Sequence, residues 1–186
     1  MTPTHAPISP EYLRLMARYG QWMNRNLYVA AASLSDVERK LDRGAFFKNI
    51  HATLCHLLWG DTVWMHRLAS TAGPNAGSIA QGLDLEPNFD RLRSARESFD
   101  EVMIAWADRC TASELVGDLT WFSGAAGREL TRPRWVLCIQ LFNHGTHHRG
   151  QVHAMLTAAG ARTADTDIQL LPESVFQAFI SRPGRD

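Results

Sequence analysis

Four long segments of the chain repeat apolar residues at intervals of three and four positions, which is the spacing of one face of an α-helix. The first begins at the pair Ser9-Pro10, a favourable helix start, and extends to about residue 34. The others span about residues 46–70, 89–111 and 133–160. Four amphipathic helices of this length favour an all-α fold, a four-helix bundle.

The connections between these helices are predicted to be short, apart from one crossover. Residues 35–38 match a capping box and predict one or two short turns that close near Gly44. Residues 73–88 are rich in glycine, proline and asparagine and predict a loop. Residues 119–131 predict either a short hairpin or an irregular connection before the fourth helix, and residues 174–180 predict a short C-terminal helix. With no internal repeat and no linker, residues 1–186 are expected to form a single domain.

Two histidines lie on the apolar face of the fourth helical segment. His144 and His148 are four residues apart, so they stand one turn above each other in the row that includes Leu141 and Val152. His56 lies in a stripe of apolar and small residues in the second segment, where a lone histidine is more often a core residue. Two imidazoles on one helix face form half of a transition-metal site, and facing helices of a bundle often supply the rest. Spacing alone does not decide between a metal site and a core of satisfied histidines.

The residues around this pair leave one alternative open and exclude another. His147 lies three residues after His144 and would replace His148 after a modest rotation of the helix, whereas His153 falls on a different face and is expected in solvent. A zinc protease of the HExxH type needs a glutamate directly after its first histidine, to act as general base. This chain has Gly145 there, which excludes the peptidase hypothesis.

The composition limits the expected partners and compartment. Nineteen basic and nineteen acidic residues leave no net charge to attract nucleic acid or anionic lipid. The three cysteines form no CxxC motif and fit a reducing cytoplasm, with Cys55 and Cys138 expected to be small buried hydrophobic residues. Residues 1–5 lack the pattern of a signal peptide, and no apolar run reaches about 18 residues. We therefore expect a soluble, cytoplasmic protein that binds neither nucleic acid nor membrane.

Four stretches of the chain resemble the DinB-like family of bacterial proteins, which is named after a damage-inducible gene. Residues 46–68 resemble the second-helix signature of that family, and residues 143–151, NHGTHHRGQ, with Leu156 after them, resemble its fourth-helix signature. Residues 19–24, YGQWMN, look like its first-helix pattern, and residues 165–170 look like the region after its last bundle helix. The stretches occur in the family's order, and the resemblance extends over nearly the whole chain.

The resemblance implies a four-helix bundle that holds one divalent metal ion per chain, zinc or nickel, on three histidines and water. Matched residue by residue, these ligands fall on His56, His144 and His148. Many members of the family are homodimers, so the resemblance implies a homodimer for this chain. Members with known activity use low-molecular-weight thiols, including mycothiol-dependent maleylpyruvate isomerases and bacillithiol transferases.

The function expected from this resemblance is a metal-dependent enzyme that activates a small thiol for attack on a small-molecule substrate. The alternatives are a metal-dependent hydrolase that uses bound water, and a non-catalytic, stress-linked protein with a structural metal. No general acid or base is identifiable from the sequence. Asp61, Trp64 and Arg67 fit the family pattern, with Asp61 expected to form a structural salt bridge. Three residues near the histidine pair either orient the ligands, bind an anionic substrate or form helix-packing hydrogen bonds: Asn143, Arg149 and Gln151.

Overall fold

A computed structural model of the chain describes residues 6–180, and the side chains of residues 6–177. The expectation made for residues 1–5, and the last six residues of the predicted domain, lie outside the described residues.

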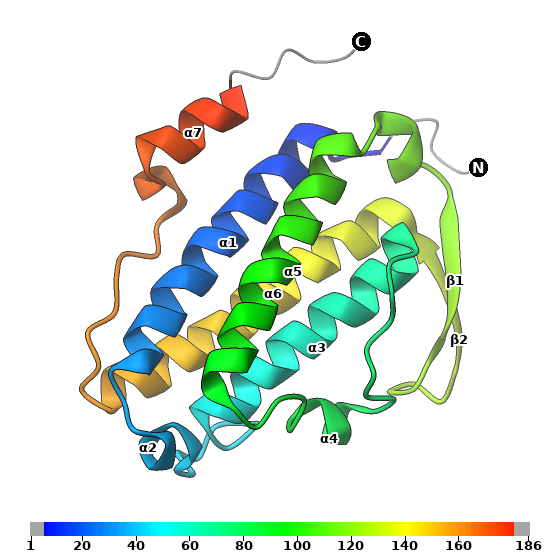
Figure 1. The fold of residues 1–186 in the computed structure, drawn as a ribbon. Coiled ribbons are helices and arrows are strands. Elements are labelled where there is room, and N and C mark those ends of the chain that lie inside the picture. The colour runs from blue at the N-terminus through cyan, green and yellow to red at the C-terminus, as the bar shows by residue number, and fades with distance from the viewer. Residues whose placement is uncertain (1–5, 181–186) are drawn as a thin grey trace.

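Four long helices form the body of the molecule: α1 (Pro10–Ala32), α3 (Ile50–Ala69), α5 (Phe89–Arg109) and α6 (Arg134–Ala158). Helix α1 packs against α5 and α6, and α3 packs against the same two helices, so the four close into a ring around one core (Figure 1). This arrangement confirms the predicted all-α, bundle-like fold.

Smaller elements connect the bundle helices. Helix α2 (Asp36–Lys40) starts at the predicted capping box, in which the Ser35 hydroxyl and the Glu38 carboxylate each accept a backbone N–H. A 3-10 turn (Ala112–Leu115) precedes strands β1 (Asp118–Ser123) and β2 (Arg128–Pro133), which pair antiparallel, so the hairpin alternative for residues 119–131 is the correct one. A second 3-10 turn (Ile168–Leu170) leads to α7 (Glu173–Ile180), the predicted C-terminal helix.

The predicted start of the second bundle helix at Phe46 is wrong by four residues. Lys48 has a left-handed backbone conformation, with φ of 65°, which cannot continue an α-helix. The helix begins instead at Ile50, because the Asn49 side chain accepts a hydrogen bond from the backbone N–H of Ala52 and acts as the N-cap. Phe46 and Phe47 consequently lie in a tight turn in front of the helix rather than on its first turn.

The segment 73–88 is not entirely a loop, because it contains the short helix α4 (Ile79–Gly82). Helix α4 packs on the indole of Trp59, and a Cβ added at Gly82 would lie only 2.6 Å from that ring. The Trp59 indole N–H also donates to the carbonyl of Ala76, 2.8 Å away. These contacts hold the crossover segment against α3.

The apolar core consists of two clusters with a buried polar layer between them. One cluster joins the second half of α1 and the first half of α3, including Leu27, Leu54 and Val152 of α6. The other joins the opposite halves of the same helices, including Leu13 and Met65. On each of the four bundle helices, buried polar residues lie in the sequence between the residues of one cluster and those of the other. We call these five residues the ionic layer: Asn24, Asp61, Arg96, Asp100 and Arg149.

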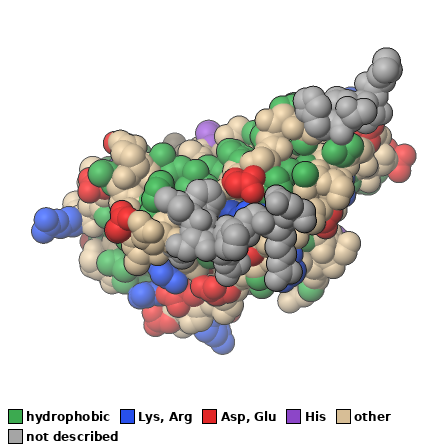
Figure 2. All heavy atoms as spheres, turned by 90° about the horizontal axis from the view of Figure 1, so that it is seen from above, with side chains coloured by type: hydrophobic (Ala, Val, Ile, Leu, Met, Phe, Trp, Pro, Cys, Tyr) green, Lys and Arg blue, Asp and Glu red, His purple; other side chains and the backbone are tan. Residues whose placement is uncertain are grey.

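No helix of the described chain is long and apolar enough to cross a membrane. Both ends of the described chain lie at the same end of the bundle (Figure 1). Seen from that end, acidic and basic side chains are interspersed among hydrophobic ones, without a continuous area of one charge (Figure 2).

Candidate metal centre

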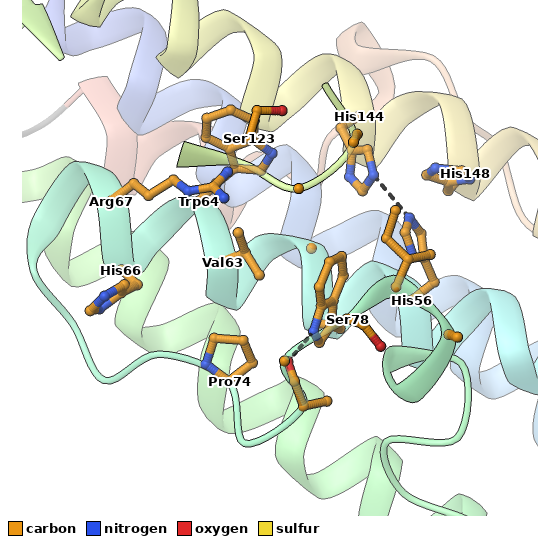
Figure 3. Close-up of a pocket in the computed structure, with 18 of the residues that line it drawn as sticks. His56, Val63, Trp64, His66, Arg67, Pro74, Ser78, Ser123, His144 and His148 are labelled. Atoms are coloured by element: carbon orange, nitrogen blue, oxygen red, sulfur yellow. Dashed lines mark hydrogen bonds between the residues drawn. The ribbon is translucent and has the colours of Figure 1, made fainter. Parts of the chain in front are cut away.

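The structure brings together the three histidines that were predicted as ligands. His56 comes from α3, while His144 and His148 stand one turn apart on α6, which packs against it. One nitrogen from each ring lies within 4.8 Å of the other two, and the Nε2 atoms of His56 and His144 are 3.1 Å apart (Figure 3). Distance alone therefore permits one small ion to contact all three rings.

The three imidazoles are held in the neutral form that binds metals. Burial, helped by the neighbouring imidazoles, lowers the pKa of His56 to about 3 and that of His144 to about 4. Burial also lowers the pKa of His148, although its hydrogen bond to Gln151 opposes the shift. Near neutral pH each ring therefore carries a nitrogen lone pair instead of a second proton.

Gln151 determines which nitrogen of His148 faces the cluster. Its side-chain oxygen lies 2.8 Å from Nδ1 of His148, and because an amide oxygen only accepts, that Nδ1 carries the proton. The lone pair is then on Nε2. Of the three alternatives for Gln151, this hydrogen bond agrees with the one in which it orients a histidine of the cluster.

Two neighbouring residues, Gly60 and Phe47, shape the cluster, although the sequence analysis assigned neither of them a role. A Cβ added at Gly60 of α3 would lie 2.6 Å from Cε1 of His144, so only glycine leaves room for that ring. The Phe47 ring lies against His56 and His148, at centroid distances of 4.1 and 5.3 Å. The sequence did carry a signal for Gly60, because a glycine inside a helix usually has a packing reason. It carried none for Phe47, because the position of this ring depends on the turn before α3, which was predicted as helix.

The remaining histidines lie outside this cluster. The exposed His147 contacts Gln151 through Nε2, at 3.2 Å, and the group of three close nitrogens does not include it. His153 is half-buried on α6 and does not line the cavity described below. The helix rotation that would exchange His147 for His148 is not seen.

The cluster fits a divalent metal ion. Zinc–nitrogen bonds are about 2.0–2.1 Å long, so two ligands of one tetrahedral ion stand roughly 3.3 Å apart, close to the 3.1 Å between the Nε2 atoms of His56 and His144. The Nδ1 atoms of these two rings are buried without a hydrogen-bond partner, so Nε2 is the polar atom that each ring aims at the cluster. Three neutral imidazoles beside an open cavity match a donor set that leaves one coordination position free, rather than a closed set of four protein ligands.

A cavity of about 1170 Å³ opens next to the three histidines. Its floor is α3 and α6, and its sides are the crossover segment with α4 and the tip of the β1–β2 hairpin. Most of the lining is apolar, and it includes three tryptophans: Trp59, Trp64 and Trp121. No aspartate or glutamate is among the described residues that line it.

The ionic layer accounts for two of the predicted supporting residues. Asp61 forms the expected structural salt bridge, at 2.7 Å from the guanidinium of Arg96. Arg149 is buried in the same layer, where a Cβ at Gly145 would lie 2.8 Å from its Nη1, and it does not line the cavity. Arg149 is therefore a helix-packing residue rather than an anion-binding one. Asn143 is exposed and also lies away from the cavity.

Cys55 and Cys138 are buried free thiols, as predicted. Burial raises the pKa of Cys55 to about 11 and that of Cys138 to about 12, so both remain protonated near neutral pH. Neither thiol lines the cavity, so neither is placed to react with a ligand bound there.

Comparison with known proteins places this geometry in a family. A sequence model of the DinB family matches residues 6–179. The chain is 21% identical over 152 residues to Protein DinB of Bacillus subtilis (strain 168), an alignment that covers 82% of this chain and 88% of the relative. No solved structure matches.

Proposed function

Because the chain belongs to the DinB family, we propose that it is a metal-dependent enzyme. In this proposal His56, His144 and His148 hold one divalent ion, zinc or nickel, and the cavity beside them receives a low-molecular-weight thiol and an electrophilic substrate. The observation that carries the proposal is the convergence of three neutral imidazoles on one edge of a large cavity.

A divalent ion on neutral imidazoles lowers the pKa of a thiol or a water molecule that binds beside it. The cavity walls favour a thiol as the nucleophile. No carboxylate among the described residues lines the cavity to act as general base. An ordinary thiol has a pKa of about 8.5, so it ionises near neutral pH with little help, whereas water needs much more. The thiol proton leaves to solvent, and a sulfur lone pair forms the new bond to the electrophilic atom of the substrate. The bond from that atom to its leaving group, or the π bond of an unsaturated acceptor, breaks at the same time, and the released electron pair takes up a proton from solvent.

The chain's own residues would position these reactants. Gln151 holds His148 in one tautomer, and Gly60 allows the His144 ring to approach α3. The rings of Trp59 and Phe47 lie against His56, at centroid distances of 5.7 and 4.1 Å, and cover this edge of the cavity.

Hydrolysis by a bound water is the second candidate function. The exposed His147 favours it, because its ring lies 4.8 Å from that of His148 at the cavity edge and offers an imidazole base. A His147→Gln variant that loses ester hydrolysis but keeps thiol transfer would support this second function.

Elemental mass spectrometry tests the metal site. Protein prepared without a histidine tag or nickel column should contain about one divalent ion per chain. Each of the variants His56→Ala, His144→Ala and His148→Ala should lose the ion while the helical circular dichroism persists. His153→Ala, a histidine of α6 outside the cluster, is the matched control and should keep the ion.

Calorimetry with glutathione and cysteine as probes tests the thiol. Metal-loaded wild type should bind at least one of them, and metal-free protein should bind it more weakly. Wild-type protein that is folded but contains no metal would refute the proposed metal site. Metal-loaded protein that binds neither thiol would refute the proposed reaction, while the metal site would stand. A chain that unfolds when the metal is removed would favour a structural metal instead.

A further inference from the structure

Arg67 lies in the cavity at the end opposite the histidines. It follows His56 by eleven residues on α3, which places the two Cα atoms about 16 Å apart along the helix axis. Figure 3 shows its guanidinium turned toward Trp64, inside the lining of the cavity, with His148 and His56 at the far side. The cavity therefore has a cationic end at Arg67 and a histidine end at His56, and both residues belong to helix α3.

The guanidinium is held in place by aromatic rings rather than by an acid. Its Cζ atom lies 4.8 Å from the ring centroid of Trp64 and 5.9 Å from that of Trp121. Within the described part of the chain, no carboxylate pairs with Arg67 and no acceptor receives a hydrogen bond from it. Its five N–H donors are thus left for a ligand or for water, although burial lowers the pKa of the group.

The charge of the cavity is one-sided. Among the described residues that line it, Arg67 is the one permanently charged side chain, and no acidic residue balances it. Between His56 and Arg67 along α3, the lining includes Trp59 and Val63, and the crossover segment adds Pro74 and Ile79 to an otherwise mainly apolar wall. An apolar ligand with an anionic end matches this order of surfaces.

We propose that the cavity binds a ligand with an apolar or aromatic body and a terminal carboxylate, with the carboxylate on Arg67 and the opposite end at the three histidines. A guanidinium suits a carboxylate because its planar fork makes two parallel hydrogen bonds. The identity of the reacting end rests on the proposed function, whereas the recognition of the carboxylate by Arg67 does not. Arg67 is a specificity residue in this arrangement, since it lies far from the reacting atoms.

Binding to metal-free protein tests the inference, because a carboxylate then has no metal ion to bind. The probes are 6-phenylhexanoate, its uncharged amide and 6-phenylhexylammonium, measured by calorimetry and by quenching of tryptophan fluorescence. Wild type should bind the carboxylate about tenfold more tightly than the amide, as expected for a charge-assisted hydrogen bond in a partly buried site, and should bind the ammonium compound most weakly.

Two variants and one control decide the role of Arg67. Arg67→Met should bind carboxylate and amide equally, and Arg67→Lys should keep part of the preference because the charge remains without the fork. Arg25→Met, which removes an exposed arginine of α1, should behave like wild type. The ratio of two affinities in one variant is insensitive to a change in its stability. Equal binding of carboxylate and amide by wild type, or a preference that survives in Arg67→Met, would overturn the inference.

A further variant separates this inference from the metal site. His144→Ala should keep the carboxylate preference even though it is expected to lose the metal. Wild type that contains no metal as purified but prefers the carboxylate would refute the proposed function alone. Wild type that contains metal as purified but shows no preference once the metal is removed would refute this inference alone.

Discussion

Helices α3 and α6 each contribute buried polar side chains to two regions, the ionic layer and the histidine cluster. The two regions differ in which partners their polar groups have. In the ionic layer, Arg96 contacts Asp61 of α3 at 2.7 Å and Asp100 at 2.9 Å. Asn24 of α1 donates to the same Asp100, so charges and amide are paired across three helices, although Nε of Arg96 has no partner. In the histidine cluster the groups are neutral, and their lone pairs converge beside a cavity.

The difference separates a structural network from a ligand site. Buried charges that are paired mostly hold helices in register, because each partner already satisfies the other. In the described chain the neutral imidazoles of the histidine cluster form no ion pair, and Nε2 of His56 contacts Nε2 of His144 at 3.1 Å. A metal ion would bind the lone pairs that these rings present to one another. Both regions are rich in polar groups, so burial alone does not distinguish them.

The largest expected effect is the loss of Arg96. Arg96→Met removes the ion-pair partner of two buried carboxylates, those of Asp61 and Asp100, and we expect the free energy of unfolding to fall by about 3–5 kcal/mol. Urea unfolding measures this. Arg93→Met, at a partly exposed position of the same helix, should change the free energy of unfolding by less than about 0.5 kcal/mol. Equal effects of the two variants would show that the ionic layer does not hold the bundle.

Gly60→Ala should damage the histidine cluster and spare the ionic layer. The new Cβ would lie 2.6 Å from Cε1 of His144 and displace that ring. We expect metal affinity to fall between about tenfold and a hundredfold. Competition with a chelator measures it. Gly150→Ala makes the same change in α6, where nothing lies within 4 Å of the added atom, and should leave affinity unchanged. Unaltered affinity in Gly60→Ala would mean that His144 does not bind through the ring position seen here.

Gln151→Leu should have a smaller effect on the same site. It removes the acceptor from Nδ1 of His148 and frees the ring to change tautomer. We expect metal affinity to fall by about tenfold with unchanged stability of the metal-free protein. Asn143→Ala, an exposed position of the same helix, serves as the control. A loss of stability without a loss of affinity would assign Gln151 to helix packing.

The smallest expected effect on stability is that of His56→Leu, and it contrasts directly with the large loss expected for Arg96→Met. In metal-free protein, His56→Leu should change the free energy of unfolding by less than about 1 kcal/mol in either direction, since a neutral imidazole with an unpaired Nδ1 gives way to an apolar group. Chemical denaturation of chelator-treated protein measures it. A loss above about 2 kcal/mol would show that the histidines stabilise the core without metal, and the contrast with the ionic layer would fail.

The helices and their faces could be predicted from the sequence, whereas their ends depended on single residues. Helix α5 was predicted closely because its apolar spacing ends near the loop at each side. The start of α3 was misplaced because the apolar Phe46 and Phe47 continue the helical pattern, while Lys48 takes a left-handed conformation there. Asn49 carried the correcting signal, since asparagine is a preferred N-cap.

By itself, the sequence determined the bundle and the pairing of His144 with His148, because helical periodicity and a four-residue spacing are local properties. Its resemblance to a family also pointed to His56 as the third member. Only the tertiary structure showed that His56, 88 residues from His144, meets the pair while His147 stays outside. It alone placed Arg67 against Trp121 of the hairpin, at the far end of the same cavity. Such contacts depend on how α3, α6 and the hairpin pack, and no local pattern encodes them.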